Sequence, residues 1–471
     1  MGPRKFLLAT GAEPENLTIG FTLLLYMFPH SNSESVALPP ESAYGPAAES
    51  PDAGAPELSP GPPPMLFDVD DYGASAGGDA TEAFLAAWKD ACNSSSDPSL
   101  FLVPEGKTYL LMPLSFGGPC RSTTITAMVS QATGDRSQYY AYRSPSACSV
   151  RDVYVAGDQI RGTLEAPSNR SVWLDGDRRE RWITFEDVDG LHVMGGGTLN
   201  GHGQEWWINS CKVNKSMKCV AGPTAMYFRS CNHLVVDDLE VKDSMQMHVV
   251  IASCWKAAVS RLFVTAPGWS PNTDGIHVSN SREVSITNCI ISTGDDCISI
   301  VSGSEFVRAS GIYCGPGHGI SIGSLGANKS LAHVSDVLVE KATLVGTTNG
   351  VRIKTWQGGE GSAERITFQD IKMYNVTNPI IIDQNYCDSK KPCSEEDSAV
   401  AISDIRYNNI HGTSLSKVAV KFICSSAVHC DGIVMQDVSL VGQKGAYLKC
   451  SSVNARVITP GFNSPYCTAD M

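Results

Sequence analysis

The 471-residue sequence has no run of five or more lysine or arginine residues, and its formal net charge is −13. Proteins that bind nucleic acid usually carry a basic stripe that displaces counterions from the phosphates. An acidic surface also argues against binding to anionic membranes. We therefore expect no nucleic acid partner and no stable membrane insertion, although a local pair of basic side chains can still hold one anionic group.

Long apolar segments are scarce as well. The apolar run at residues 17–28 is too short to span a bilayer comfortably and has the length of a signal-peptide core. Residues 29–65 are rich in Pro, Ser, Ala and Gly, and such a segment buries too little apolar surface to fold. We predict an irregular secretion signal and largely disordered leader over residues 1–66, with a short anchor or a misassigned start as alternatives, followed by a single folded domain over 67–471.

Pairs of cysteines with the spacing of zinc ligands are also missing. The 16 cysteines form an even number, and several lie close together in the sequence, which favours disulfides formed in an oxidising compartment. Six glycosylation sequons agree with a secreted, extracellular protein. The close cysteine pairs are Cys387 with Cys393, Cys424 with Cys430, and Cys297 with Cys314; the sequons begin at Asn16, Asn93, Asn169, Asn214, Asn328 and Asn375.

Helical periodicity is convincing only at residues 80–92, where Ala83, Phe84, Ala87, Trp88 and Ala91 share one face. From about residue 182 onward, short segments alternate β-branched and polar residues, break at Gly, Asn or Asp, and recur roughly every 23 to 36 residues. This pattern predicts an all-β solenoid of stacked parallel coils. The helix would cap the N-terminal end of the solenoid core.

A second repeated segment, five residues long, begins at Asp274, Asp296, His318, Asn349 and Pro379. Its third and fifth residues are Ile or Val and should point inward, whereas the fourth should point outward. If the segments are stacked strands about 4.8 Å apart, Asp274, Asp296 and His318 form one ladder. The fourth residues form a second ladder, with Lys354 two residues beyond its last member: His277, Ser299, Ser321 and Arg352.

The first ladder places Asp274 and Asp296 on adjacent coils, with Asp295 next in the chain. Such clustering drives the carboxyl pKa values apart, so that one group is an acid and another a base, as hydrolysis of a glycosidic bond requires. Taken singly, an Asp-Gly or Asp-Asp pair is usually a turn residue, and His318 between two glycines is usually a turn histidine. Those glycines would let a ligand approach the backbone closely.

Basic residues follow the carboxylates. Arg352 and Lys354 alternate on one strand face, and beside the carboxylates they suggest recognition of an acidic sugar, although a solvated basic pair is the ordinary alternative. Tyr386 could stack on a sugar ring or hydrogen-bond to it. An ordinary packed tyrosine explains the same sequence equally well.

Four segments, at residues 270–277, 293–298, 315–326 and 352–356, resemble in order the signature motifs of the polygalacturonase family of glycoside hydrolases, and most closely its plant branch. The resemblance extends from about Phe67 to Cys467. It implies a right-handed parallel β-helix of the pectin-lyase type. It also implies hydrolysis, with inversion, of the α-1,4 bonds of de-esterified pectin in the cell wall.

The resemblance also implies residue roles. Asp295 would be the general acid, Asp274 and Asp296 together the base that holds the attacking water, and His318 the residue that supports the acid. Substrate binding would fall to Arg352, Lys354 and Tyr386, and also to Asn272 in the first motif. The expected partner is a pectic polysaccharide, with no metal or other cofactor, and the protein is expected to be monomeric with an acidic pH optimum.

The chain departs from the family pattern at residues 129–161, an atypical insertion that contains Cys148 and lacks strand periodicity. Three alternatives remain open. A substituted pectin such as rhamnogalacturonan or xylogalacturonan could be the substrate. A pectate lyase is also a β-helix but needs calcium and a basic proton acceptor. A catalytically silent wall-binding protein would have no need of all three aspartates. The sequence leaves internal and end-on cleavage undecided.

Overall fold

The computed structural model describes residues 65–95, 98–129, 162–173, 180–388, 393–445 and 447–467. The leader, apart from its last two residues, and the insertion, apart from Val129, lie outside these ranges. Both therefore stay predictions, as does a monomeric state. Within the described ranges, no helix has the length and apolar character needed to cross a membrane.

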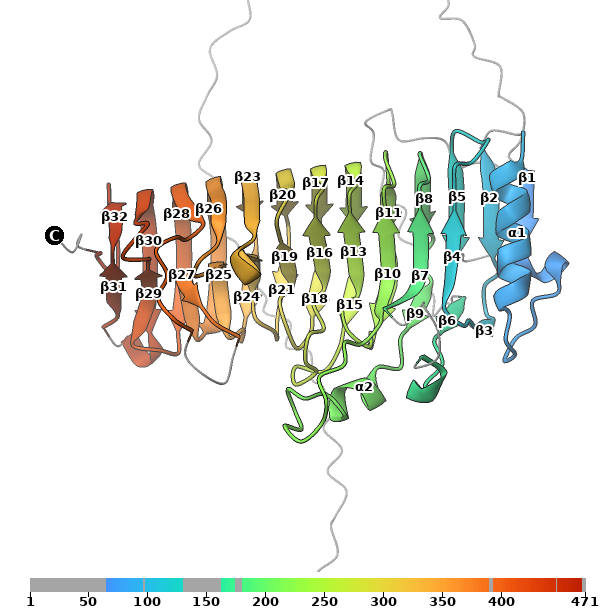
Figure 1. The fold of residues 1–471 in the computed structure, drawn as a ribbon, viewed down its shortest axis with the longest axis horizontal. Helices are drawn as coiled ribbons and strands as arrows, with labels where there is room; N and C mark the ends of the chain where they lie inside the picture. The colour runs from blue at the N-terminus through green and yellow to red at the C-terminus, as the bar shows by residue number, and fades with distance from the viewer. Residues whose placement is uncertain are drawn as a thin grey trace, which may run out of the picture. The chain divides into compact units, whose positions relative to one another are not determined.

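The described chain folds into two long parallel sheets that wind around a common core (Figure 1). All the pairings between their strands are parallel, which confirms the predicted parallel β-helix. The 11-stranded sheet contains β4 (Leu114–Gly117), β7 (Arg181–Glu186), β10 (Thr224–Arg229), β13 (Val249–Ala252), β16 (Ile276–Ser279), β19 (Ile298–Ile300), β22 (Ile320–Leu325), β25 (Asn349–Trp356), β27 (Asn378–Tyr386), β29 (Val418–Ile423) and β31 (Lys449–Val453).

The 21-stranded sheet supplies the remaining wall of the coils. It contains β1 (Met65–Asp68), β2 (Ser99–Val103), β3 (Thr108–Leu110), β5 (Ile125–Val129), β6 (Thr163–Glu165), β8 (Leu191–Met194), β9 (Thr198–Asn200), β11 (Val235–Asp237), β12 (Glu240–Lys242), β14 (Trp255–Ser260), β15 (Phe263–Thr265), β17 (Arg282–Thr287), β18 (Ile290–Ser292), β20 (Ser304–Ser310), β21 (Tyr313–Cys314), β23 (Leu331–Glu340), β24 (Thr343–Val345), β26 (Glu360–Val376), β28 (Ala401–Ser414), β30 (Cys430–Gly442) and β32 (Ala455–Ile458).

The core is a set of side-chain ladders, because equivalent residues of successive coils pair in register. Phe185 stacks on its register partner Phe228 with ring centroids 5.3 Å apart, and Phe368 stacks on Tyr407 at 5.4 Å. All four are buried. Stacked aromatic pairs add to the stability from area burial alone, so the inward positions fix the coil register and thereby place the outward side chains.

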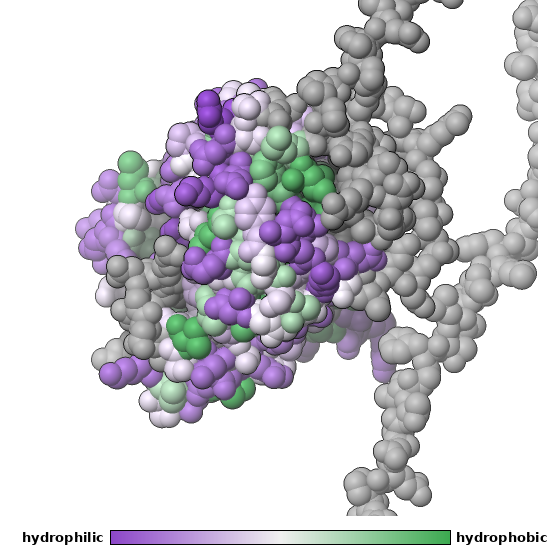
Figure 2. Space-filling view, turned by 90° about the vertical axis from the view of Figure 1, so that its right-hand side faces the viewer, coloured by the Kyte–Doolittle hydropathy of each residue, from purple (hydrophilic) through white to green (hydrophobic). Residues whose placement is uncertain are grey.

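Helix α1 (Thr81–Asn93) covers the N-terminal end of the core, as the periodicity predicts. Phe84 and Trp88 meet Phe101 of β2 edge to face, and Ala83 is the one predicted face residue that stays partly exposed. Seen from this end, the described surface is a mosaic of hydrophilic and hydrophobic residues, with no open apolar core (Figure 2). The other short elements are α2 (Gln204–Ile208) and the 3-10 turns η1 (Val69–Tyr72), η3 (Arg170–Trp173), η4 (Ala327–Lys329) and η5 (Gln443–Gly445).

Six disulfides join cysteines of the described chain, and the three pairs expected from close spacing are among them. Three further cysteines, Cys231, Cys254 and Cys289, are buried thiols outside these disulfides. Each lies at a different coil and faces the interior, where a small side chain packs well. Cys148 lies outside the described residues.

Candidate active site

The second predicted ladder lies on the outer face of the 11-stranded sheet, and the members of the first lie in the loops directly before its strands. Ile276, Ile298, Ile320 and Val351 pair successively and are fully buried. The outward residues that follow them, His277, Ser299, Ser321 and Arg352, pair in the same register. The two equal sequence intervals thus translate into adjacent coils, and the loops that precede β16, β19 and β22 bring the carboxylates and His318 together.

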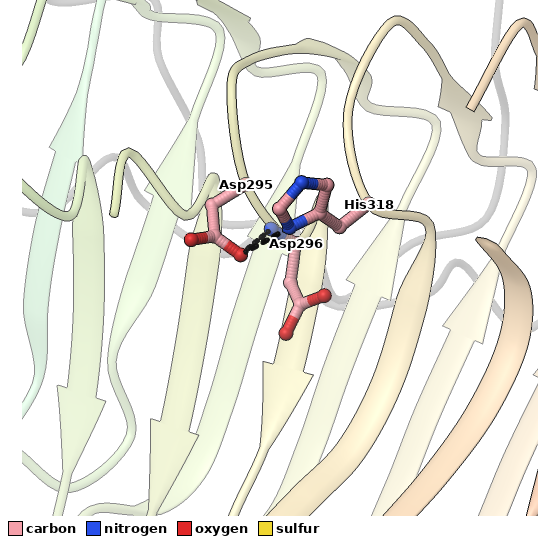
Figure 3. Close-up of side chains that lie close together, drawn as sticks. All are labelled: Asp295, Asp296 and His318. Carbon is pink, nitrogen blue, oxygen red and sulfur yellow. Dashed lines mark hydrogen bonds and ion pairs between the residues drawn. The ribbon is translucent and has the colours of Figure 1, made fainter. Parts of the chain in front are cut away.

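Asp295 lies in the loop before β19 and pairs with His318 in the loop before β22. His318 Nδ1 lies 2.9 Å from Asp295 Oδ1, and the His318 backbone N–H donates to the Asp295 carbonyl oxygen at 2.8 Å (Figure 3). The side chains of Asp295 and Asp296 point in different directions, as expected for consecutive residues. Asp295 keeps 18 % of its side-chain surface exposed and Asp296 only 2 %, so Asp295 is the carboxyl that a ligand reaches first.

Asp296 is buried, and both of its carboxylate oxygens accept hydrogen bonds. Its Oδ1 accepts hydrogen bonds from Ser321 Oγ at 2.8 Å and from an Arg352 guanidinium nitrogen at 2.8 Å, and its Oδ2 accepts one from Lys354 Nζ at 2.7 Å. Arg352 Nε also donates to Ser321 Oγ at 3.1 Å. Buried charges persist when they are paired and hydrogen-bonded. The two cations predicted to bind substrate therefore also hold Asp296 in place.

Asp274 is held by the second ladder. Its Oδ2 accepts a hydrogen bond from Ser299 Oγ at 2.8 Å, and His277 Nδ1 lies 2.7 Å from the same hydroxyl. Because Ser299 donates its proton to Asp274, His277 must donate to Ser299. Burial lowers the pKa of His277 to about 4, so its ring is neutral near neutral pH. Ser299 and Ser321 therefore orient Asp274 and Asp296. The sequence repeat predicted that both serines lie on the second ladder but did not predict this role.

The pKa values of Asp274 and Asp295 move in opposite directions. Burial and the negative charges of Asp295 and Asp296 raise the pKa of Asp274 well above its usual value. Burial also acts to raise the pKa of Asp295, but the hydrogen bond and charge of His318 and the charge of Lys354 outweigh it and lower this pKa. The carboxyl that the family resemblance makes the general acid thus has a lowered pKa, and the carboxyl with the raised pKa lies one coil away.

Replacing His318 by alanine is expected to raise the pKa of Asp295, because the burial that opposes ionisation then remains without the histidine. If Asp295 is the acid, the alkaline limb of the kcat/KM against pH profile moves to higher pH, and the maximal rate falls. A pH profile of the variant over oligogalacturonides measures this shift. His233→Ala, at a surface histidine paired with Asp189, is the control, and a limb that stays or moves to lower pH contradicts the assignment.

The two other predicted binding residues also reach the site. Lys354 Nζ lies 5.5 Å from the centre of the Tyr386 ring, and the ring meets Trp356 edge to face at 5.3 Å. Burial raises the Tyr386 pKa to about 12, so the hydroxyl remains a donor. Asn272 Nδ2 lies 3.4 Å from Asp295 Oδ2, a long contact that directs the amide towards the carboxylate. Tyr386 therefore borders the cations, and Asn272 borders the exposed carboxyl.

The loops around the carboxylates are packed tightly against one another. A Cβ on Gly294 would lie 2.0 Å from the Ser270 carbonyl oxygen, and the disulfide Cys297–Cys314 ties the residue after Asp296 to β21. Gly317 and Gly319 have φ of +147° and +85°. A Cβ on either would collide with the carbonyl of a neighbouring loop or coil, so both glycines permit close approach of the protein's own backbone.

A cleft beside Asn272 escaped the sequence prediction. It has a volume of about 700 Å³, within the range of roughly 300–1,000 Å³ usual for ligand sites. Its walls come from the loop around α2, from the loops before β13 and β16, and from the chain after β27. No sequence pattern marked this cleft, because the two adjacent tryptophans of the segment 204–208 are buried. The residues that line the cleft include Trp206, Trp207, Lys212, Asn272 and Asp388.

Asp295, Asp296 and His318 each offer a ligand atom within 4.8 Å of the others, the spacing of a metal site. The donor set does not fit a divalent cation, because both Asp296 oxygens are already paired with Arg352 and Lys354 and His318 Nδ1 is bound to Asp295. Two fixed positive charges next to the same carboxylate would repel the ion. That no metal is needed nevertheless stays a prediction.

The family model of glycosyl hydrolases family 28 matches residues 92–459. The chain belongs to this family. It is 49% identical to a polygalacturonase of Persea americana over 87% of this chain and 81% of that protein, and 47% identical to polygalacturonase QRT2 of Arabidopsis thaliana over 86% and 85%. A polygalacturonase of Erwinia carotovora has the same fold, with a TM-score of 0.64 at 19% identity over 85% of this chain and 98% of that one. The protein is therefore a glycoside hydrolase.

Proposed function

We propose that this family 28 hydrolase cleaves the α-1,4 bonds of polygalacturonate, the de-esterified backbone of pectin. The observation that carries the proposal is the cluster formed by Asp295 and Asp296 before β19 and by Arg352 and Lys354 on β25, two coils along the same sheet. It combines carboxylates, which can transfer protons, with cations, which can hold a uronate. The polygalacturonases among its relatives support the same substrate.

The charges at the site suit a substrate with one carboxylate per sugar. Arg352 and Lys354 place two cations against the single carboxylate of Asp296. A galacturonate carboxylate would then complete the balance near Arg352, whose planar guanidinium can bind it with two parallel hydrogen bonds. Tyr386 and Asn272 border the same space. Recognition of galacturonate by these four residues is part of the proposal.

In the proposed mechanism, Asp295 gives its proton to the leaving glycosidic oxygen, and Asp274 with Asp296 removes a proton from the attacking water. The exposed Asp295 carboxyl is the one that can reach a bound sugar. The reactive form needs a proton on Asp295 and an ionised Asp274, the reverse of the order in which burial and the neighbouring charges set their pKa values. These two carboxyls therefore titrate together.

The site should discriminate strongly for the uronate. We expect rapid release of reducing ends from polygalacturonate, and a rate at least about tenfold lower on the same polymer with its carboxyls reduced to alcohols, because a buried guanidinium without its anion loses about 1–3 kcal/mol of binding. Arg352→Gln should narrow this difference. Equal rates on both polymers contradict the proposal, and faster cleavage of xylogalacturonan or rhamnogalacturonan favours a substituted pectin.

We further propose that the protein is secreted and acts in the cell wall. The disulfides of the described chain support an oxidising compartment, because cytosolic proteins seldom keep such bonds. The plant relatives are named polygalacturonases, and pectin is a wall polymer. Detection of the full chain in the culture medium of an expressing plant cell, with its sequons occupied, tests the assignment.

A further inference from the structure

An ion pair crosses the outer face of the 11-stranded sheet. Lys212 Nζ lies 2.6 Å from Asp388 Oδ2, although the two residues are 176 positions apart in the sequence. Lys212 belongs to the loop that precedes β10, and Asp388 to the chain that follows β27. Strands in this sheet are parallel, so their starts form one edge and their ends the other. The pair therefore joins opposite edges.

The row of proposed catalytic and substrate-binding residues lies between Lys212 and Asp388 along the sheet. In the sheet order, β13, β16, β19, β22 and β25 separate β10 from β27. Asp274 and Asp295 precede β16 and β19, and Arg352 lies in β25. Lys212 and Asp388 also line the cleft of about 700 Å³ that reaches Asn272, the neighbour of Asp295. A sugar chain bound along the row would pass beneath the ion pair.

We propose that the Lys212–Asp388 pair is a strap across the substrate cleft that retains the polygalacturonate chain between successive cuts. This inference rests on the proposed function and adds a determinant of how the polymer is cleaved. A linear chain under a closed strap leaves by sliding along the cleft, whereas an open strap lets it leave sideways. A closed strap therefore favours several cuts per encounter.

The strap opens readily because both side chains are exposed, Lys212 to 43% and Asp388 to 52%. An exposed ion pair shifts an open–closed equilibrium by up to about fivefold, and salt weakens it. Such a pair is too weak to bar entry of a chain and strong enough to delay its release. Low ionic strength should accordingly favour repeated cuts, and high ionic strength single cuts.

The test compares the loss of viscosity with the release of reducing ends from polygalacturonate. Lys212→Met and Asp388→Asn should each lower the number of ends released per unit loss of viscosity by about two- to fivefold, because each encounter then yields fewer cuts. The reversed pair, Lys212→Asp with Asp388→Lys, should restore the wild-type ratio. Lys218→Met removes a charge from the same loop outside the cleft lining and should leave the ratio unchanged.

Other outcomes overturn the strap. If Lys212→Met alone changes the ratio and Asp388→Asn does not, Lys212 binds substrate directly and the pair is incidental. If the reversed pair fails to restore the ratio while each variant remains folded and cleaves a galacturonate trimer at the wild-type rate, no strap exists. Failure of the proposed function is distinct, since the wild-type protein would then release no ends from any galacturonate substrate.

Discussion

Asp295→Asn is expected to lower kcat on polygalacturonate by about 10²–10⁴-fold, the usual contribution of a positioned general acid. Asparagine keeps the shape of the side chain and can still contact His318, but it has no proton to give to the leaving oxygen. The loss should appear mainly in kcat and little in KM. Reducing-end release measures the rate, and circular dichroism verifies that the coils are intact.

The matched control for this variant is Asp71→Asn, an exposed acid near the N-terminal cap. It makes the same chemical change far along the chain from the catalytic loops. Retention of more than about a tenth of the wild-type rate by Asp295→Asn would remove Asp295 from the acid role. Asp274 would then be the remaining candidate, because burial and the neighbouring carboxylates raise its pKa well above the usual value.

Asp296→Ala is expected to destabilise the fold by about 3–5 kcal/mol, because it leaves Lys354 and Arg352 buried without their counter-charge. Asp296 accepts hydrogen bonds from both cations, and Lys354 is only 7% exposed. The unfolding midpoint in guanidinium chloride, measured with the disulfides intact, reports the change. Activity should be lost as well, since Asp296 belongs to the proposed base.

A second substitution separates the charge effect from a general packing defect. Adding Lys354→Met to Asp296→Ala removes one unpaired cation and should recover a large part of the lost stability, although no activity. Lys354→Met alone leaves Asp296 paired with Arg352 and should cost less than Asp296→Ala. Equal unfolding midpoints for wild type and Asp296→Ala would show that the cluster contributes nothing to folding.

The sequence predicted which side chains the coils bring together, because a solenoid converts sequence intervals into spatial neighbours. Asp274, Asp296 and His318 are each 22 residues apart, and a period that constant leaves one possible register for Ile276, Ile298 and Ile320. The capping helix was equally predictable, because Phe84, Ala87, Trp88 and Ala91 form a stripe that must be buried. Local periodicity of the sequence was therefore sufficient to predict both the strand register and the capping helix.

Other features depend on interactions that no local pattern encodes. The opposite pKa shifts of Asp274 and Asp295 follow from burial in the folded site, from the carboxylates around Asp274, and from the contact of His318 with Asp295. Predicting that Cys231 and Cys254 remain thiols would require knowing which cysteines face the core, because an even number of cysteines is compatible with any number of disulfides. The ion pair of Lys212 with Asp388 joins two irregular loops, whose conformations the strand repeat does not specify.

The separation between the Asp295 and Asp296 carboxyls bears on whether hydrolysis inverts or retains the anomeric configuration. The closest oxygens of Asp295 and Asp296 lie within 4.8 Å, whereas inverting glycosidases usually separate acid and base by roughly 6.5–9.5 Å and retaining ones by roughly 5–5.5 Å. Separation between this pair alone does not support inversion. The proposed mechanism instead makes Asp274, one coil away, a partner in holding the water.

Proton NMR of the products formed in the first moments of polygalacturonate cleavage tests the central claim most directly. Hydrolysis by water at the carboxylate row, with inversion of the α bond, predicts that new reducing ends appear first as the β-anomer and mutarotate later. An initial α-anomer would contradict the direct attack of water and point to a glycosyl–enzyme intermediate. Unsaturated sugar ends would contradict hydrolysis itself and make the protein a lyase.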